Sequence, residues 1–500
     1  MKKAALIGSG FSSLSAACYL AKAGYEVTVF EKNDTIGGRA QQYVKDGFKF
    51  DMGPSWYWMP DVFERFFADF DKTSADFYTL DQLGPAYEIY FGSDDKFTVD
   101  DNLESIAQRF ESIEKGAGKK LKKFISAAKD NYEIAIQDLV YKPGESLSEL
   151  VSMKTLKKLH QFASTISRDV RAQFKDDRLR KVLEFPALFL GAKASKTPSF
   201  YNFMNYADFG MGTWYPKGGM YAVVQGIFQL AISLGVDFKF YATVDSISVD
   251  EGKVDGIYVH QEFHPFDIVV SGADYAHSES LLPMEYRQYS DDYWKSKTYA
   301  PSALLFYIGI DKKLPNLTHH SLFFDTDFDE HARAIYDEPT YPKDPLFYAS
   351  FPTISDDSIA PAGKEAGTIL IPLAPGMEDD QKVIDAYFDQ VIERIEEQCN
   401  VSIKDSLLFK KQFTINDFVK EYNSYKGNAY GMANTLLQTA ALRPKLKSKK
   451  VSGLFFTGQL TVPGPGVPPS LISGKLVADL VLKYNPLDTS RKKFLLAASL

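Results

Sequence analysis

The stretch AALIGSGFSSLSAACYLAKAGYEVTVFEK, residues 4–32, decides the fold class. The apolar run over residues 4–7 predicts a buried strand, and Glu26 to Phe30 predicts a second one. Leu14 to Ala23 predicts a helix with small residues along it, which ends at Gly24. A strand, a glycine-rich turn, a helix and a strand in this order predict a βαβ unit of the dinucleotide-binding type.

The turn between the first strand and the helix has the features of a phosphate-binding loop. Gly8 permits a tight turn, and Gly10 lets the backbone approach a pyrophosphate. Phe11, Ser12 and Ser13 complete the turn, and the helix start offers free N–H groups and a positive dipole end. Ser13 replaces a third glycine that serves close helix–strand packing, and serine is small enough to keep that contact with a slight adjustment.

The bulk composition sets limits on the fold and on the partners. The 500 residues are too many for one compact core and predict two or three domains. The 45% hydrophobic and 24% charged residues are an ordinary globular balance, and the net charge of -8 argues against nucleic-acid binding. The two cysteines cannot form a disulfide framework, which favours a reducing compartment and hence the cytoplasm.

Two long uncharged runs are not expected to span a membrane. Residues 218–236 carry Gln225, Gln229 and Ser233 at four-residue spacing, a single polar stripe that predicts an amphipathic helix. Residues 452–474 contain four prolines, which a simple spanning helix does not tolerate. No signal peptide is expected, because the first apolar run stops at Gly8.

The residues after the second strand identify the nucleotide. Glu31 closes that strand and can accept hydrogen bonds from both ribose hydroxyls, and Lys32 beside it is a further candidate for cofactor binding. Gly37-Gly38-Arg39 and then Asp51-Met52-Gly53-Pro54-Ser55 resemble the superfamily of flavin-dependent amine oxidases and carotenoid desaturases. The resemblance implies that the cofactor is FAD. It places Gly38 and Arg39 near the pyrophosphate, and Gly53, Pro54 and Ser55 beside the flavin ring.

The C-terminal part carries matching pieces. Residues 453–459 predict a strand and a turn, and residues 470–483 predict a helix after a proline- and glycine-rich loop. The resemblance implies that these segments close the flavin site, with Gly458, Gln459, Val467 and Pro468 as cofactor-binding candidates. It also implies that the helix N-terminus points at the pyrimidine end of the ring. Gln459 stands where many flavoproteins have an acid, and it can still hydrogen-bond a ribityl or phosphate group.

The middle of the chain connects these ends. Residues 236–274 read as a run of strands, in which Val244 would pair the adenine edge through its backbone. The predicted fold is therefore an α/β protein with a Rossmann-type FAD-binding domain, an inserted mixed-sheet substrate domain and a helical membrane-associating region. The predicted FAD-binding parts are residues 1–75, 211–290 and 441–500, the substrate parts 76–110 and 291–440, and the helical region 111–210.

More specific motifs narrow the resemblance to the bacterial phytoene desaturases. They are WYPKGGM at residues 214–220, SGAD at residues 271–274, LRP at residues 442–444 and PGPGVPP at residues 463–469. The resemblance implies a membrane-associated FAD enzyme that desaturates a long acyclic isoprenoid, with phytoene as the default substrate and lycopene as the product. Hydroxylated carotenoids and C30 carotenoids stay open as alternatives, and oxygen or a quinone would be the electron acceptor.

Desaturation removes a hydride and a proton from adjacent carbons, and a flavin accepts the hydride. The hydrocarbon offers no polar handle, so an apolar tunnel must position it by shape. Trp56, Tyr57 and Trp58 are candidates for the tunnel wall. Glu149 is the weak catalytic candidate for accepting the proton, because some family members carry an acid near this place; loss of the proton to water or to the flavin stays open.

A basic segment predicts contact with a lipid surface. Residues 154–181 carry nine basic side chains against three aspartates, with apolar residues at mostly helical spacing. A basic amphipathic helix beside an apolar segment is typical of peripheral membrane attachment. The tail over residues 491–496, with Arg491 and Lys492 before Phe494, could add a second contact.

Other classes of protein stay open. An amine oxidase of the same fold would often keep a cysteine for flavin attachment, and neither Cys18 nor Cys399 lies near Gly458. A prenyl-binding chaperone, like the GDP dissociation inhibitors, would not need a complete cofactor site. The seven histidines show no metal spacing, so no metal is expected, and the side chains of the adjacent His319 and His320 are expected to diverge.

Overall fold

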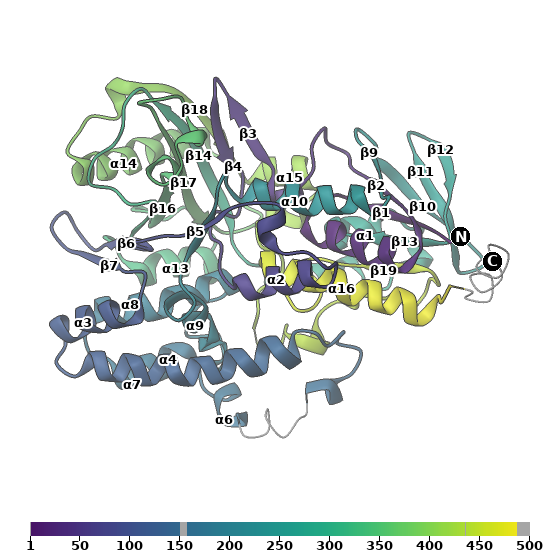
Figure 1. Ribbon diagram of the computed structural model, residues 1–500, viewed down its shortest axis with the longest axis horizontal. Coiled ribbons are helices and arrows are strands. Elements are labelled where there is room, and N and C mark those ends of the chain that lie inside the picture. The colour runs from purple at the N-terminus through teal and green to yellow at the C-terminus, as the bar shows by residue number, and fades with distance from the viewer. Residues whose placement is uncertain (1, 151–157, 436, 488–500) are drawn as a thin grey trace.

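The computed structural model describes residues 2–150, 158–435 and 437–487 (Figure 1). Three regions lie around a common centre. A parallel sheet with its helices forms the right-hand lobe of Figure 1, a larger mixed sheet the upper left, and a set of helices the lower left.

The right-hand lobe is built on a five-stranded parallel sheet in the order β19-β13-β1-β2-β9. Its strands are β1 (Lys3–Ile7), β2 (Glu26–Phe30), β9 (Asp237–Lys239), β13 (Ile268–Ser271) and β19 (Leu454–Phe456). Residues from the two ends and the middle of the chain therefore share one sheet. The predicted strands near the N-terminus and their parallel pairing are confirmed, while the exact domain boundaries stay a prediction.

Both faces of this sheet are covered, because successive side chains of a strand point to opposite sides. Ala4 and Leu6 of β1 pack against three helices, while Ala5 and Ile7 pack against a three-stranded antiparallel sheet. The helices are α1 (Phe11–Ala23), α10 (Met220–Ser233) and α16 (Val467–Tyr484), and the strands are β10 (Val244–Asp250), β11 (Lys253–Val259) and β12 (Glu262–Pro265). The helix α1 begins at Phe11, three residues earlier than expected, and Gln225, Gln229 and Ser233 of α10 are exposed as predicted.

The upper-left lobe holds a seven-stranded mixed sheet in the order β18-β14-β17-β16-β15-β6-β7. Its strands are β6 (Tyr87–Tyr90), β7 (Lys96–Val99), β14 (Ser302–Ile310), β15 (His320–Phe323), β16 (Phe347–Ser350), β17 (Glu365–Leu373) and β18 (Leu407–Phe413). Leu304, Phe306 and Ile308 face the long helix α14 (Gln381–Cys399). The opposite face of the sheet turns toward the centre of the molecule.

Smaller elements connect the lobes. They are the strand pairs β3 (Gln42–Lys45) with β4 (Phe48–Asp51) and β5 (Leu80–Gln82) with β8 (Trp214–Pro216), and the helices α2 (Pro60–Ala68), α11 (Tyr275–Ser280), α12 (Asp291–Lys295), α13 (Phe328–Tyr336) and α15 (Ile415–Tyr422).

The lower-left region is helical, as expected, but its basic segment is not one helix. Its helices are α3 (Leu103–Ile113), α4 (Ala117–Ile134), α6 (Leu159–Phe162), α7 (Ile166–Gln173), α8 (Asp177–Glu184) and α9 (Phe203–Phe209). The prediction of a single amphipathic helix is wrong for residues 158–181, because Ile166, Val170 and Phe174 are almost fully buried in the protein's own core. Residues 154–157 and the tail over residues 491–496 lie outside the described residues.

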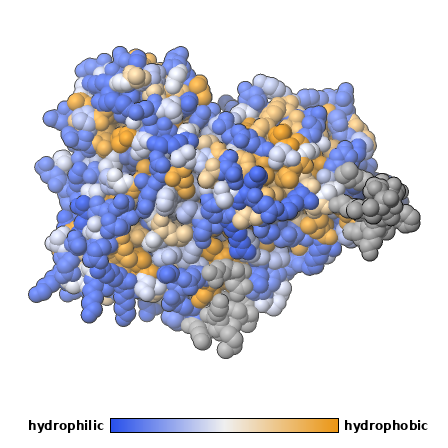
Figure 2. Space-filling model, viewed as in Figure 1, coloured by the Kyte–Doolittle hydropathy of each residue, from blue (hydrophilic) through white to orange (hydrophobic). Residues whose placement is uncertain are grey.

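Several of the basic side chains in this segment have partners within the protein. Arg171 pairs with Glu184, Arg178 pairs with Asp95 and Asp176, and Lys181 pairs with Asp177. Figure 2 shows the face seen in Figure 1 as largely hydrophilic, with apolar side chains in several separate patches. Within the described residues, no helix is both long enough and apolar enough to cross a bilayer.

Candidate active site

A continuous cavity of about 840 Å³ lies where the three regions meet. The glycine-rich turn and its neighbours line one part, and apolar side chains from the mixed sheet and the helical region line the rest. Every residue predicted to bind the cofactor lines this cavity except Ser13: Gly8, Gly10, Phe11, Ser12, Glu31, Lys32, Gly38, Arg39, Gly53, Pro54, Ser55, Val244, Gly458, Gln459, Val467 and Pro468. Residues far apart in the sequence are thus gathered in one place, although their contacts with a cofactor stay predictions.

The glycine-rich turn presents bare backbone to the cavity. Gly8 has a φ of 86°, a left-handed conformation that favours glycine. A Cβ added to Gly10 would have nothing within 4 Å, so the backbone here is open to a ligand. Gly10 is also the N-cap of α1, and no side chain caps this helix. The first N–H groups of α1 are therefore available to a phosphate.

The carboxylate of Glu31 is fixed by its neighbours at the end of β2. One oxygen accepts hydrogen bonds from the backbone N–H of Ser9 at 2.9 Å and from its hydroxyl at 2.7 Å. The other accepts from the backbone N–H of Asn33 at 2.9 Å. The side chain is buried yet lines the cavity, so its remaining lone pairs can accept hydroxyl groups of a ribose.

Ser13 faces the sheet instead of the cavity. Its hydroxyl is fully buried, and among the described residues it has no hydrogen-bond partner. A Cβ added to Gly272, which follows β13, would lie 2.0 Å from this oxygen. In this fold the third glycine of the turn usually allows the helix to pack closely on the sheet. Here Gly272, on the sheet side of the contact, allows the same close packing.

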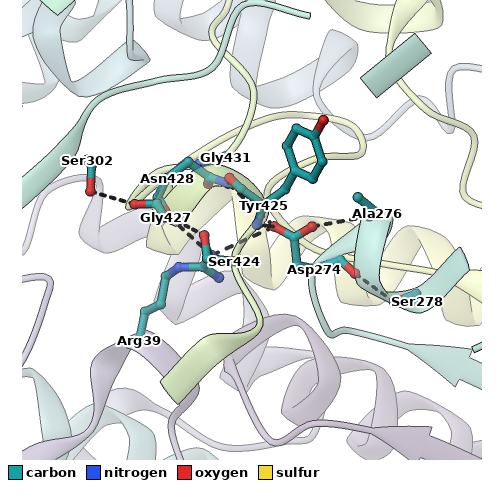
Figure 3. A network of polar contacts seen from close by, with 10 residues as sticks. All are labelled: Arg39, Asp274, Ala276, Ser278, Ser302, Ser424, Tyr425, Gly427, Asn428 and Gly431. Carbon is teal, nitrogen blue, oxygen red and sulfur yellow. Dashed lines mark hydrogen bonds and ion pairs between the residues drawn. The ribbon is translucent and has the colours of Figure 1, made fainter. Parts of the chain in front are cut away.

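Arg39 anchors a polar network that joins distant loops (Figure 3). Its guanidinium donates to the Ser424 hydroxyl at 2.9 Å and to the backbone oxygen of Asn428 at 3.4 Å, and it lies 4.0 Å from Asp274. Asp274 in turn accepts hydrogen bonds from the backbone N–H groups of Ala276 and Tyr425. Burial lowers the pKa of Arg39 and raises the pKa of Asp274, because removal from water outweighs their attraction at this separation.

One atom of Arg39 is left for a ligand. Its Nε has no hydrogen-bond partner among the described residues, although Arg39 lines the cavity. Gln459, with its amide oriented by the hydrogen-bond network, accepts from both Arg39 Nη atoms at 3.1 and 3.2 Å and from Gly431 N at 3.2 Å. The Gln459 side-chain oxygen therefore orients Arg39. The predicted contact of Gln459 with a ribityl or phosphate group would then be made by its amide nitrogen.

The helix α16 closes the same end of the cavity from the C-terminal side. It begins at Val467, with Gly466 as its N-cap at a φ of 116°, and no side chain caps it. Ser15 of α1 donates to the backbone oxygen of Leu471 at 2.8 Å, and a Cβ on Gly474 would lie 2.4 Å from the backbone oxygen of Ser12. The two helices that carry the predicted phosphate and flavin contacts thus lie in direct contact.

Asp51 holds the start of α10 beside the cofactor-binding stretch. Its carboxylate accepts from the backbone N–H groups of Met220 at 2.7 Å and Tyr221 at 3.1 Å. Burial raises the pKa of Asp51 to about 7, although these two hydrogen bonds lower it. A Cβ on Gly219 would lie 2.4 Å from the Asp51 carboxylate, so glycine is required there. This contact joins the DMGPS and WYPKGGM stretches in the folded chain.

The rest of the cavity is apolar. Trp56 and Trp58 line it as predicted, whereas Tyr57 is buried elsewhere with its hydroxyl 2.9 Å from that of Tyr78. Further apolar lining residues are Ile136, Leu139, Val140, Phe162, Phe185, Leu188, Leu190, Phe200, Phe203, Met204, Leu322, Phe324, Phe328, Ile335 and Leu346. Among the described residues, the charged side chains that line the cavity are Glu31, Lys32, Arg39, Lys142, Glu149, Asp274 and Glu421. A long hydrocarbon fits such a surface.

Glu149 lines the cavity, but its carboxylate is occupied. One oxygen accepts from the backbone N–H of Gly144 at 2.8 Å, and the other accepts from Glu145 at 2.9 Å and Ser146 at 3.1 Å. Glu149 thereby folds the loop before the short 3₁₀ helix at Leu147–Leu150. A role in catalysis stays a prediction, and the structure shows a local structural role.

Together these features fit FAD. The uncapped start of α1, the open backbone at Gly10 and the free Nε of Arg39 suit a pyrophosphate, and Glu31 suits a ribose. Sequence reasoning missed the loop at residues 424–431, because its residues have no periodicity and meet Arg39 only in the folded chain. In the part of the chain that the structure describes, no group of three or more potential metal ligands was found.

Comparison with known proteins agrees with this site. The family model described as flavin containing amine oxidoreductase matches residues 11–482. The chain is 42% identical to a carotenoid 3,4-desaturase of Haloarcula japonica over 96% of this chain and 97% of the relative. It is 33% identical to a 4,4'-diapophytoene desaturase (4,4'-diaponeurosporene-forming) of Staphylococcus aureus, over 96% and 99% of the two chains.

Solved structures share the fold at low sequence identity. An oxidoreductase from Methanosarcina mazei matches with a TM-score of 0.63 and 18% identity, over 95% of this chain and all of that chain. Putrescine oxidase bound to putrescine matches with a TM-score of 0.60 and 14% identity, over 96% and 99% of the two chains. At these identities the likeness shows the fold alone.

Proposed function

The chain belongs to the family of flavin-containing amine oxidoreductases and uses FAD, and from this premise we propose that it is a desaturase of a long acyclic carotenoid. The observation that carries the proposal is the cavity. Its apolar part is continuous with the part that fits FAD, so a hydrocarbon bound there would reach the cofactor.

The bound flavin supplies the hydride acceptor for such a reaction. The chain's own residues position the substrate and exclude water. Trp56, Phe185 and Phe203 offer aromatic surfaces to a chain of isoprene units, which has no polar group to be gripped. Binding therefore depends on the shape and length of the cavity.

We predict phytoene as the substrate and lycopene as the end product. Hydroxylated carotenoids and C30 carotenoids are the alternatives. The relative at 42% identity is named for carotenoid 3,4-desaturation, and the one at 33% identity for 4,4'-diapophytoene. Both names support a carotenoid in general and leave the choice among substrates to experiment.

The other classes of protein find less support. A prenyl-binding chaperone does not need a complete cofactor site, whereas Glu31, Arg39 and the two helix starts form one here. An amine oxidase would share the fold. Its cationic substrate would meet a cavity lined mainly by apolar side chains, where an ammonium group would be costly to bury.

We also propose peripheral contact with a membrane, because a carotenoid must enter from lipid. Leu442 is 44% exposed and also lines the cavity, which indicates an opening there. Leu437 in the same turn is 80% exposed, and Lys142 and Lys445 lie in this region. Apolar side chains with nearby lysines suit a lipid surface. A cytoplasmic location on the membrane, with oxygen or a quinone as electron acceptor, completes the proposal.

The test is conversion in liposomes. Purified protein with FAD would be incubated with phytoene, 4,4'-diapophytoene or a hydroxylated carotenoid, and the pigments separated by chromatography. New pigments with longer-wavelength absorption are expected from one of them. Absence of conversion of all three, with flavin bound and an acceptor supplied, would refute the carotenoid proposal; oxidation of amines instead would favour the amine oxidase.

Flotation of the protein with the same liposomes tests the membrane proposal. The variant Leu437→Glu is expected to float less with anionic vesicles than the wild type, because it places a charge where an apolar side chain would meet lipid. Equal flotation of both proteins would count against this surface.

A further inference from the structure

The proton released in desaturation needs an acceptor. Behind the described cavity wall lies a histidine that is connected to the wall by hydrogen bonds. Ser55 and Tyr348 both line the cavity, and their hydroxyl oxygens are 2.8 Å apart. The Tyr348 hydroxyl is also 2.6 Å from Nδ1 of His320, which is fully buried behind the wall. Ser55 directly follows Gly53 and Pro54, the stretch expected beside the flavin ring.

His320 is held firmly in this position. The Trp56 ring stacks on the imidazole with ring centroids 4.1 Å apart and an angle of 10° between the planes. Trp56 itself lines the cavity, so the substrate, the indole and the imidazole follow one another in layers. Nε2 of His320 has no hydrogen-bond partner among the described residues. When the imidazole of His320 carries its proton on Nε2, its Nδ1 can accept a hydrogen bond from the Tyr348 hydroxyl.

Three other candidate acceptors along the cavity, His331, Glu149 and Tyr336, are occupied or have no onward partner among the described residues. Nδ1 of His331 accepts from the backbone N–H of Leu346 at 2.8 Å, and its Nε2 lies 2.9 Å from the backbone oxygen of Pro372. The Glu149 carboxylate accepts three backbone N–H groups. The hydroxyl of Tyr336 has no described partner through which a proton could pass on.

We propose that Ser55, Tyr348 and His320 form a proton relay for the desaturation, which rests on the function proposed above. When one carbon has lost its hydride to the cofactor, the C–H bond on the adjacent carbon breaks and its electron pair forms the double bond. The proton passes to Ser55 Oγ, the Ser55 proton passes to Tyr348 Oη, and the Tyr348 proton passes to Nδ1 of His320. His320 acts through the two hydroxyls and is a positioning residue, whereas Ser55 meets the substrate.

The surroundings keep His320 neutral at rest and favour release of a proton that it has accepted. Burial and the neighbouring His319 lower its pKa well below the ordinary value, so the imidazole is neutral at physiological pH. The ring of His319 lies 4.4 Å from that of His320, centroid to centroid, so the two side chains do not diverge as expected. His319 Nδ1 is 3.0 Å from the hydroxyl of the half-buried Ser355.

Three variants of the full-length, FAD-loaded protein test the relay in carotenoid liposomes. Tyr348→Phe removes the hydroxyl and keeps the ring, and His320→Gln removes the base and keeps an acceptor for Tyr348. Tyr90→Phe is the matched control, because Tyr90 is also buried in the same sheet, its hydroxyl donates to Glu88 at 2.7 Å, and it does not line the cavity. Initial rates would be measured in H₂O and D₂O, with the bound flavin quantified by its absorbance.

Tyr348→Phe and His320→Gln are each expected to lower kcat about 100-fold or more, the usual contribution of a general base, with KM and flavin content unchanged. The solvent isotope effect seen in the wild type should disappear, and the double variant should be no slower than either single variant. Tyr90→Phe should stay within about twofold of the wild type. An active Tyr348→Phe variant with an unchanged isotope effect would overturn the relay, whereas an inactive wild type would overturn the proposed function and the relay with it.

Discussion

The contact between Ser13 and Gly272 leads to a sharp prediction about the packing of α1 on the parallel sheet. In Gly272→Ala the new Cβ would lie 2.0 Å from the Ser13 hydroxyl oxygen, where ordinary contacts begin at 3.4 Å. The next neighbours are Ser13 Cβ at 3.3 Å and Thr457 Cγ2 at 3.4 Å. Gly272 does not have a positive φ, so the substitution brings a clash without backbone strain.

The clash should cost about 1–3 kcal/mol of the free energy of unfolding, the range for overpacking a well-packed core. The serine side chain is the obstacle, so a second change there should restore stability. Ser13→Gly in the Gly272→Ala background should recover most of the lost free energy of unfolding. The recovery should fall short by roughly 1 kcal/mol, because glycine destabilises the interior of a helix by about that amount. Ser13→Ala alone should stabilise the protein slightly, because it deletes a buried hydroxyl without a described partner.

The assay is urea unfolding of the wild type, Gly272→Ala, Ser13→Gly, the double variant Ser13→Gly/Gly272→Ala and Ser13→Ala, followed by tryptophan fluorescence with and without saturating FAD. Gly92→Ala is the control, since a Cβ at that position would have nothing within 4 Å and Gly92 has no positive φ. The two changes should couple by about 1 kcal/mol or more in a double-mutant cycle. An unchanged urea midpoint for Gly272→Ala would refute the reasoning. So would a loss of unfolding free energy from Gly272→Ala that is the same whether residue 13 is serine or glycine.

Three further predictions concern the cofactor, the pH dependence and the substrate. Arg39→Lys keeps the charge but loses the forked contacts, so FAD affinity in a fluorescence titration should fall about 10-fold or more; equal affinity would contradict the network. The folded pKa of Asp51, about 7 against an ordinary 3.8, means that its contribution to stability is present below pH 4 and lost as pH rises through 7. Urea unfolding of Asp51→Asn should therefore show a weaker loss of stability across pH 4–7 than the wild type, and identical curves would contradict the raised pKa. Met204→Trp should narrow the apolar part of the cavity and raise KM for the carotenoid while flavin content stays unchanged; lowered flavin content would indicate a wider disturbance.

Much of the cofactor site could be predicted from local sequence. Gly8, Gly10 and Glu31 lie within one βαβ unit, where the order of strand, turn and helix dictates their positions. The helix α16 could also be predicted, but it begins at Val467, three residues before the expected Ser470, because Pro468 and Pro469 lie in its first turn and not in the preceding loop. These signals depend on backbone geometry over a few residues, which is why sequence reasoning found them.

Contacts between distant segments could not be predicted in this way. Nothing in the sequence pairs Ser424 with Arg39, or Gly272 with Ser13, because only the folded chain brings them together. The adjacent His319 and His320 lie at the start of a strand, so strand alternation does not separate their rings.

The basic segment shows a second limit of sequence patterns. Apolar residues at helical spacing look the same whether they face lipid or the protein's own core. Ile166, Val170 and Phe174 face the core here, and three short helices replace the expected long one. Such a pattern predicts amphipathicity, whereas the partner of the apolar face depends on the rest of the fold.

The contact between α1 and α16 has a consequence for how the protein is made. Ser15 and Leu471, which join the two helices, are 456 residues apart. At a synthesis rate of about 5–20 residues per second, α1 would wait roughly 20–90 s before its partner is translated. During that time its apolar face and the turn at Gly8 stay without the strand and helix that complete them. The nascent chain therefore cannot take up FAD at a finished site until translation nears its end, and a molecular chaperone has time to bind the unpaired helix.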